Sequence, residues 1–269
     1  VGVTMDKVKV ITGDTGTTPY GGGTWASRGA GIGGEAVLLA GRALQQNILD
    51  VAAAILKMDK AELDVADNHV VGKLTQEKKL PLAEVGRVGY FRPDTLPMDF
   101  QSELTVTRHY TPRQYGFTFT NGIQASWVEV DPDTGFVKLL KHWCVEDSGT
   151  IINPMLVDEQ IRGGVVQGIG AALFEECLYG PDGQMLNANL ADYLVPMAGE
   201  MPDIVCGHVE TPTKQSQLGA KGVGEAGTAG APGAVMNAIN DALAPLNARV
   251  FSMPFTPERI LRALGKVPS

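Results

Sequence analysis

The sequence predicts an α+β fold of mixed sheets and packed helices, divided into two subdomains, residues 1–110 and 111–269. Three observations support this prediction. Apolar residues recur at helical spacing between residues 35 and 57, and residues 123–145 alternate as a β-hairpin does. A weakly patterned stretch that contains several prolines, residues 87–115, separates these two patterns and marks the subdomain boundary.

The composition excludes several classes of protein. With 44% hydrophobic and 19% charged residues, the 269-residue chain is too apolar and too weakly charged for a disordered protein. No apolar run reaches the roughly 18 residues of a membrane-spanning helix. The net charge of −8 excludes nucleic acid as a partner, and the densest basic stretch, residues 73–79, is a solvated loop. The 33 glycines indicate that parts of the backbone pack closely against another group.

The first subdomain opens with a predicted short strand, Val8–Ile11. A loop of small residues over 17–34 leads into a long, mostly buried helix, Glu35–Lys57, whose apolar residues have helical spacing. Asp59 is the expected N-cap of a second, short helix. A strand and turn follow over Leu63–Val71.

The second subdomain begins with the clearest hairpin, Ile123–Val130 and Phe136–Val145, around an Asp-Pro-Asp-Thr-Gly turn. We expect Trp127 and Trp143 of this hairpin to pack in the core. A helix is predicted over Val157–Phe174, and its four internal glycines are tolerable if another element packs against that face.

A second loop of small residues, Thr211–Gly230, precedes the last two predicted helices. The first of them covers Gly233–Leu243, with Pro232 at its first turn. The second covers Pro257–Leu264, with Thr256 as its cap.

The glycine-rich stretch Gly29–Gly34 contains the spacing Gly-x-Gly-x-x-Gly at the start of a helix. A dinucleotide site of the Rossmann type needs a strand immediately before this spacing, and the nearest expected strand ends near Ile11. Two alternatives remain open. Either the backbone amides bind some other anionic group, or the glycines allow tight packing of a helix on a strand.

Glu225 is the candidate general base. It lies among glycine and alanine in the segment Gly219–Gly227, where low hydration would raise the pKa of its carboxyl toward neutral pH. The alternatives are that Glu225 is an anion at a helix start, or that it pairs with Lys221.

Gln167 lies on a helix face kept bare by glycines and could bind a ligand through its amide, or hydrogen-bond to a neighbouring loop. The four histidines are separated along the chain, which favours structural or surface roles over metal binding. The three cysteines are also widely spaced, so each is expected to be a small buried hydrophobe in a reducing compartment. No signal peptide is visible, and we expect a cytoplasmic location, or a periplasmic one if a partner carries the export signal.

Four segments together resemble one enzyme family. They are Gly13–Thr15 with Thr18–Gly21, Gly23–Arg28, Val166–Gly170 and Gly219–Glu225. In this order they resemble the carboxy-terminal part of the molybdenum-binding large subunit of the xanthine oxidase family. The likeness is greatest to the bacterial branch of aerobic carbon monoxide dehydrogenases, aldehyde oxidoreductases and N-heteroaromatic hydroxylases, and it covers essentially the whole chain.

The resemblance implies a molybdenum cofactor-binding domain that oxidises an aldehyde or an N-heteroaromatic carbon, with water as the oxygen source and Glu225 as the general base. The implied cofactor is molybdenum with molybdopterin cytosine dinucleotide. Its dithiolene would hold the metal, so no metal ligand is expected from the protein. The residues expected to bind the cofactor are Gly23, Thr24, Ala26, Ser27, Arg28, Gln167, Lys221, Gly222, Val223 and Gly224.

The resemblance also implies partners, because the family's glycine/phenylalanine-rich cofactor loop and arginine-containing loop are absent from this sequence. We expect the N-terminal half of the molybdenum subunit on another chain and a small subunit with two 2Fe–2S clusters. An FAD subunit or a haem cytochrome is a further expected partner. Two alternatives stay open: a carbon monoxide dehydrogenase, whose copper-binding cysteine would lie on the missing half, and a non-catalytic scaffold that closes the cofactor pocket.

Overall fold

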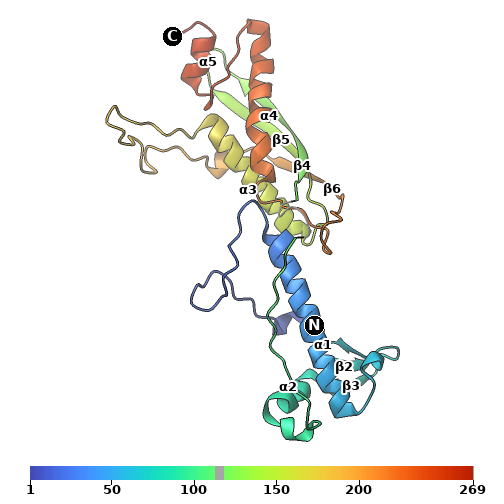
Figure 1. Cartoon of the computed structure of the whole chain (residues 1–269). Coiled ribbons are helices and arrows are strands. Elements are labelled where there is room, and N and C mark those ends of the chain that lie inside the picture. The colour runs from blue at the N-terminus through green and yellow to red at the C-terminus, as the bar shows by residue number, and fades with distance from the viewer. Residues whose placement is uncertain (113–117, 269) are drawn as a thin grey trace. The chain divides into compact units, whose positions relative to one another are not determined.

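The computed structural model describes residues 1–112 and 118–268 and divides the chain into two compact units (Figure 1). The first unit is Val1–Gly23 with Ile32–Pro112, and the second is Thr24–Gly31 with Arg113–Ser269. The short segment of residues 24–31 therefore belongs with the second unit, although it is distant from that unit in the sequence.

The first unit is built on the long helix α1 (Glu35–Leu56), which follows a π-helical turn, η2 (Gly29–Gly34). The predicted helix is confirmed, but its burial is lower than expected. Its buried apolar residues Leu49, Val51 and Ala52 gather toward the C-terminal end, where they meet the adjacent sheet, and Glu35 is buried at the first turn. Val37, nearer the other end, is 73% exposed.

An antiparallel sheet of three strands covers this buried end of α1. Its strands are β1 (Leu63–Ala66), β2 (His69–Gly72) and β3 (Lys78–Pro81). Before β1, the carboxylate of Asp59 caps the short helix η3 (Lys60–Glu62) by accepting a hydrogen bond of 2.9 Å from the amide of Ala61, as predicted. Strand β3 was not predicted, because the basic stretch from which it begins resembles a solvated loop.

Two predictions for the first unit are wrong. The first is Val8–Ile11, which is not a strand. It is an exposed segment after the 3-10 turn η1 (Met5–Lys7), because no strand in the described part of the chain pairs with it. The stretch expected to be irregular from residue 87 onward begins inside helix α2 (Leu82–Phe91), whose Val85 and Val88 are buried. Local pattern alone missed α2 because its apolar face is short.

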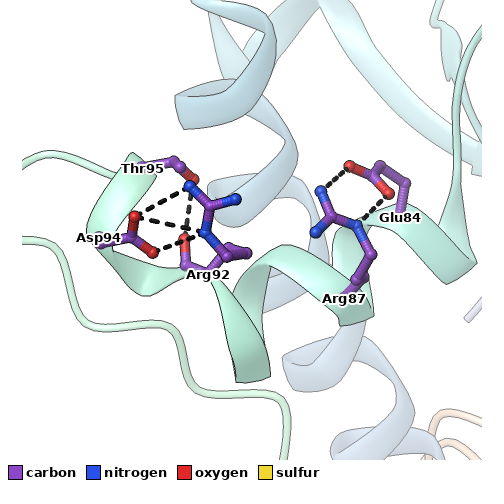
Figure 2. A network of polar contacts seen from close by, with 5 residues as sticks. All are labelled: Glu84, Arg87, Arg92, Asp94 and Thr95. Carbon is purple, nitrogen blue, oxygen red and sulfur yellow. Dashed lines mark hydrogen bonds and ion pairs between the residues drawn. The ribbon is translucent and has the colours of Figure 1, made fainter.

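Two exposed ion pairs lie on α2 and just beyond its C-terminal end (Figure 2). The guanidinium of Arg87 binds both carboxylate oxygens of Glu84 at 2.7 Å, and Arg92 binds Asp94 at 2.9 Å. The Thr95 hydroxyl donates to the backbone oxygen of Arg92 across the turn η4 (Pro93–Thr95). Exposed pairs of this kind contribute little to stability, so we assign them only the local geometry of the turn.

The second unit contains a mixed sheet with two helices against it (Figure 1). Strands β4 (Asn121–Val130) and β5 (Val137–Asp147) are antiparallel, and β6 (Ile204–Val209) pairs with β5 in parallel. The predicted hairpin is confirmed. Its turn closes through a 2.8 Å hydrogen bond from the Gly135 amide to the Asp131 oxygen, and Gly135 has a φ of 75° that suits glycine.

The burial of side chains in the second unit corrects two sequence predictions. Trp127 lies on the outer face of β4 and is 59% exposed, whereas Trp143 is half-buried. Of the three cysteines only Cys144 is buried, since Cys177 is exposed and Cys206 half-buried. The core positions on β5 are taken by Leu139, Cys144 and the neutral polar His142.

Helices α3 (Pro154–Leu173) and α4 (Ala226–Leu243) pack against each other through glycines. A Cβ at Gly168 would lie 2.8 Å from both the Ala231 Cβ and the Thr228 oxygen, and one at Gly164 would lie 3.2 Å from the Gly227 backbone. The expectation that another element presses on the glycine face of α3 is confirmed, and that element is α4.

The contact with α3 also explains why α4 starts at Ala226 rather than at the predicted Gly233. The sequence around Gly227 and Gly230 has low helix propensity, and Pro232 lies inside the helix. Packing on α3 therefore outweighs local preference here. The remaining elements are η5 (Ala198–Glu200), η6 (Ala244–Leu246) and the predicted α5 (Pro257–Ala263), capped by Thr256. Among the described residues, no helix combines the length and apolarity needed to cross a membrane.

Candidate functional site

Two segments far apart in the sequence, residues 24–31 and 219–225, meet within the second unit. The meeting point is the hydroxyl of Ser27. It donates a 2.8 Å hydrogen bond to Oε2 of Glu225 and accepts a 2.9 Å hydrogen bond from the Glu225 amide. One hydroxyl thus holds both the side chain and the backbone of the candidate base.

This close approach depends on two glycines. A Cβ at Gly222 would lie 2.6 Å from the Ser27 carbonyl oxygen, and a Cβ at Gly224 would lie 2.9 Å from the Ser27 Oγ. Any larger residue would force the two segments apart. The glycines of this loop are therefore required by the contact with Ser27, and they bring Glu225 to it.

The segment that carries Ser27 has a strained backbone. Ala26 and Ser27 have φ values of 48° and 55°, the left-handed region that non-glycine residues rarely occupy. Such a conformation costs on the order of 1–3 kcal/mol for each residue and is concentrated at functional sites. Beside it, the guanidinium of Arg28 lies 4.9 Å from the centre of the Trp25 ring, which orients the charge.

Lys221 is anchored by Asp147 at the end of β5. Its ammonium lies 3.0 Å from Oδ2 of Asp147 and donates to the Thr211 hydroxyl at 2.7 Å, with both charged side chains largely buried. Burial raises the pKa of the Asp147 carboxyl, but the hydrogen bonds from the Thr211 hydroxyl, the Gly149 and Thr211 amides and Lys221 outweigh it. The net pKa of Asp147 lies well below its usual range. Lys221 therefore pairs with Asp147 rather than with Glu225.

Backbone hydrogen bonds fix the same loop to the end of β5. The Lys221 amide donates to the Ser148 oxygen at 2.8 Å, and the Thr150 amide donates to the Gly219 oxygen at 3.0 Å. Gly149 and Ala220 form an isolated antiparallel bridge. The loop before Glu225 is thus held like an extra strand, and it cannot shift independently of the sheet.

Glu225 occupies the N-cap position of α4, although its side chain makes no capping hydrogen bond. The alternative of an anion at a helix start agrees with this position, where the helix dipole stabilises a carboxylate. The expectation of low hydration is not met in the chain by itself, because Glu225 is exposed. The carboxylate is therefore fixed in place but accessible.

Gln167 is exposed on α3 and is linked to the first turn of α4. Its Oε1 lies 3.3 Å from the Thr228 hydroxyl, which also donates to the Gly164 oxygen at 3.0 Å. Gln167 thus bonds to a helix and not to the neighbouring loop that was the expected alternative, and it lies close in space to the segment that begins with Glu225.

The structure therefore groups most of the predicted residues in the second unit. Thr24, Ala26, Ser27 and Arg28 come from one segment, and residues 221–225 come from the other. Gly23 belongs to the first unit. Sequence analysis missed Asp147, which lies at the end of β5. An aspartate followed by Ser-Gly at the end of a strand was the available signal.

The glycine-rich stretch Gly29–Gly34 is a π-helical turn continuous with α1 and is not a loop after a strand. The earliest strand in the described part of the chain is β1, which comes later. A Rossmann-type site is therefore absent from this stretch. Across residues 1–112 and 118–268, no cluster of three or more histidine, cysteine or acidic residues could hold a metal ion.

Comparisons with known proteins assign this chain to a family. A family model described as a molybdopterin cofactor-binding domain matches residues 1–202. The nicotine 6-hydroxylase large subunit of Paenarthrobacter nicotinovorans is 38% identical over 264 residues, or 98% of this chain and 32% of the relative. The carbon monoxide dehydrogenase large chain of Hydrogenophaga pseudoflava is 31% identical over 264 residues, again 98% of this chain and 32% of the relative.

A solved structure supports the same assignment. Quinoline 2-oxidoreductase from Pseudomonas putida 86 is similar with a TM-score of 0.87 and 37% identity, over 99% of this chain and 34% of that chain. The chain therefore spans about a third of the length of the relatives that it matches. The family model and the long matches at this identity give one answer: the chain belongs to the molybdopterin cofactor-binding domain family of xanthine oxidase-type large subunits.

Proposed function

We propose that this chain supplies the general base and part of the cofactor-binding surface of a molybdenum hydroxylase. The reaction is oxidation of an aldehyde or an N-heteroaromatic carbon, with water as the source of oxygen. The observation that carries the proposal is the double hydrogen bond between Ser27 and Glu225, which ties the candidate base to the candidate cofactor segment. Two relatives are named for nicotine 6-hydroxylation and quinoline oxidation, and this favours an N-heteroaromatic substrate.

The residues around Ser27 suit an anionic cofactor such as molybdopterin cytosine dinucleotide. The hydroxyl of Thr24, the guanidinium of Arg28 and the amide nitrogen of Gln167 all belong to the second unit and supply donors for an anion. The Ser27 hydroxyl gives its one proton to Glu225, so we assign Ser27 and Ala26, both with a left-handed backbone, to the cofactor through their backbone. Since the ammonium of Lys221 is bound by Asp147, we assign the stretch from Lys221 to Gly224 to the cofactor through its backbone.

When bound, the cofactor supplies the two-electron redox chemistry. The chain's own contribution is proton transfer and orientation. The Ser27 hydroxyl fixes Oε2 of Glu225, and we assign Oε1 to removal of the proton from the reacting water-derived group. The same hydroxyl accepts a hydrogen bond from the Glu225 amide, so neither the carboxylate nor the backbone of Glu225 can turn away from Ser27 without losing a hydrogen bond.

The rest of the site would come from other parts of a complex. The chain covers only 32% of its nicotine 6-hydroxylase relative, and residues 178–197, here called the arm, leave the end of α3 as a long loop (Figure 1). The arm exposes the large apolar side chains of Leu186, Leu190, Leu194, Val195 and Met197. We propose that the remaining part of the molybdenum subunit, on another chain, covers this surface.

Electrons must leave the site after each turnover. We propose a small subunit with two 2Fe–2S clusters as the acceptor, followed by an FAD subunit or a haem cytochrome. We also propose that the complex works in the cytoplasm, since an odd number of widely spaced cysteines is typical of a reducing compartment.

A second candidate function is carbon monoxide oxidation, which the 31% identity to the carbon monoxide dehydrogenase large chain supports. Metal analysis of the assembled complex separates the two functions. Molybdenum without copper is expected for the hydroxylase, whereas copper equal to molybdenum would favour carbon monoxide oxidation.

The proposed base is tested by Glu225→Gln in the assembled complex. Molybdenum content should stay at the wild-type level, because the side chain is nearly isosteric. Turnover of nicotine, quinoline and benzaldehyde should fall by about 100-fold or more, the range for loss of a general base. Full cofactor content with unchanged turnover would instead support a non-catalytic scaffold.

A further inference from the structure

The backbone on both sides of Glu225 is held by two glutamines from different elements of the second unit. Before Glu225, the amide nitrogen of Gln160 on α3 donates to the Gly224 oxygen at 2.9 Å. After Glu225, the amide nitrogen of Gln124 on β4 donates to the Gly227 oxygen at 3.0 Å and lies 3.4 Å from the Ala226 oxygen. The carbonyls that flank the base are therefore clamped from two directions.

Gln124 is itself fixed from behind. Its Oε1 lies 3.1 Å from Nε2 of His142, and the other ring nitrogen of His142 lies 2.9 Å from the Ser126 hydroxyl. His142 is fully buried, and burial lowers its pKa to about 4, so the ring is neutral at neutral pH. Because Oε1 can only accept, Nε2 carries the single ring proton and the Ser126 hydroxyl donates to Nδ1.

This chain of hydrogen bonds has one direction, from Ser126 through His142 and Gln124 to the α4 carbonyls. It orients the Gln124 amide so that its nitrogen faces α4. Gly230 of α4 adds a steric constraint, since a Cβ there would lie 2.9 Å from the Gln124 amide nitrogen. The amide is thus pressed against the helix and cannot flip without breaking its bonds to His142 and Gly227.

We propose that Gln124 and Gln160 are positioning residues for Glu225, acting on its flanking carbonyls so that the carboxylate keeps a productive orientation. The inference rests on the proposed role of Glu225 as the base. Gln124 holds carbonyls outside the stretch assigned to the cofactor, whereas Gln160 holds the oxygen of Gly224 at the end of that stretch, so molybdenum content is measured beside kcat in both variants. A displacement of about 1 Å at a reacting group can lower a rate by up to 100-fold, so small backbone shifts at Glu225 have large consequences.

The test uses Gln160→Ala and Gln124→Ala in the assembled, molybdenum-loaded complex, with Gln46→Ala on the exposed surface of α1 as the matched control. Gln160 is exposed, so its variant keeps the fold even if the half-buried Gln124 variant does not. With quinoline, nicotine or benzaldehyde we expect kcat to fall about tenfold while KM and molybdenum content stay constant, as for loss of a transition-state interaction. Gln46→Ala should keep wild-type kcat.

Two further measurements separate positioning from general stabilisation. In the Glu225→Gln background, Gln160→Ala should give no further loss of rate, because its effect passes through Glu225. Amide hydrogen exchange over residues 222–230 should be about tenfold faster in Gln160→Ala, the order expected for one lost hydrogen bond, with other segments unchanged.

The outcomes are distinguishable. Wild-type exchange over 222–230 and wild-type kcat in both glutamine variants, with Glu225→Gln inactive, would overturn the positioning role alone. An equal fractional loss of rate in the Glu225→Gln background would also overturn it. Full activity of Glu225→Gln would overturn the proposed base itself.

Discussion

At the scale of single residues, the Ser27 hydroxyl has the most consequential position in the second unit. It makes two hydrogen bonds to one residue that lies far away in the sequence, and the two glycines opposite it leave no room for a larger contact. Its left-handed backbone is compatible with this role, because the strain of that conformation is retained only where the surroundings determine it fully.

Ser27→Ala is therefore expected to release Glu225 without emptying the site. Losing the two hydrogen bonds should cost about 1–2 kcal/mol of stability, and kcat should fall at least tenfold in the assembled complex. Denaturant titration and steady-state kinetics measure the two effects. The control is Ser216→Ala, in the loop that precedes Glu225, and it should keep the wild-type kcat. An equal loss of kcat in this control would contradict the special role of Ser27.

The Lys221–Asp147 pair predicts a pH dependence at the same scale. Since the folded-state pKa of Asp147 is depressed, its contribution is present above the unfolded value near 3.9 and is lost as the pH falls through the lower folded value. Wild-type melting temperature should thus fall with acidification below about pH 4 more steeply than that of the double variant Asp147→Asn, Lys221→Met. Parallel curves for the two proteins would contradict this assignment.

Breaking only one side of this pair should be worse than replacing both. Lys221→Met leaves a largely buried carboxylate without its cation, which costs about 3 kcal/mol. Chemical denaturation at pH 7 should rank the single variant as the least stable, with the double variant between it and wild type. A single variant as stable as wild type would show that water solvates Asp147 adequately.

At the scale of elements, the contact between α3 and α4 sets where Glu225 stands, because Glu225 directly precedes α4. Gly168→Ala introduces a methyl group 2.8 Å from the Ala231 Cβ and is expected to destabilise the protein by about 1–3 kcal/mol. Gly163→Ala, on the same helix but facing open space, should instead stabilise it by up to about 1 kcal/mol. Thermal unfolding of the two variants checks the difference in sign.

The elements also show how far sequence alone can lead. The hairpin β4–β5 and the helices α1, α3 and α5 were predictable because periodicity, an Asp-Pro-Asp-Thr-Gly turn and proline-containing caps are local signals. Val8–Ile11 has the composition of a strand but no partner, and the start of α4 depends on packing against α3. Both errors arise because tertiary contacts decide the outcome: Val8–Ile11 lacks the pairing that a strand needs, and packing on α3 extends α4 beyond its local preference.

The same limit applies to the candidate site. Glu225 and Ser27 could be named from a resemblance to a family, but their contact with each other could not be derived from spacing. The glycines of α3 predicted that some element packs against that face, but only the structure shows that Gly164 and Gly168 meet α4. Gln124, Gln160 and Asp147 gave no recognisable motif, because their roles come from hydrogen bonds between distant segments.

At the scale of the whole molecule, our proposal is that the chain supplies one part of a site. It spans about a third of the relatives that it matches, and the arm exposes an apolar surface that a partner is expected to cover. Leu190→Ser and Leu194→Ser together should weaken assembly with the rest of the molybdenum subunit by at least about tenfold, measured by co-purification over a concentration series. Leu74→Ser, at a leucine that is even more exposed but lies in the first unit, should assemble normally.

The central claim is that Glu225, held by Ser27, removes a proton during the chemical step. The most direct measurement is the anaerobic single-turnover rate at which quinoline or nicotine reduces the bound cofactor in wild type and in Glu225→Gln, at equal molybdenum content. This rate reports reduction of the cofactor alone, so it does not depend on how fast electrons leave through partner subunits. We expect it to fall by about 100-fold or more in the variant. Equal rates in the two proteins would contradict the claim.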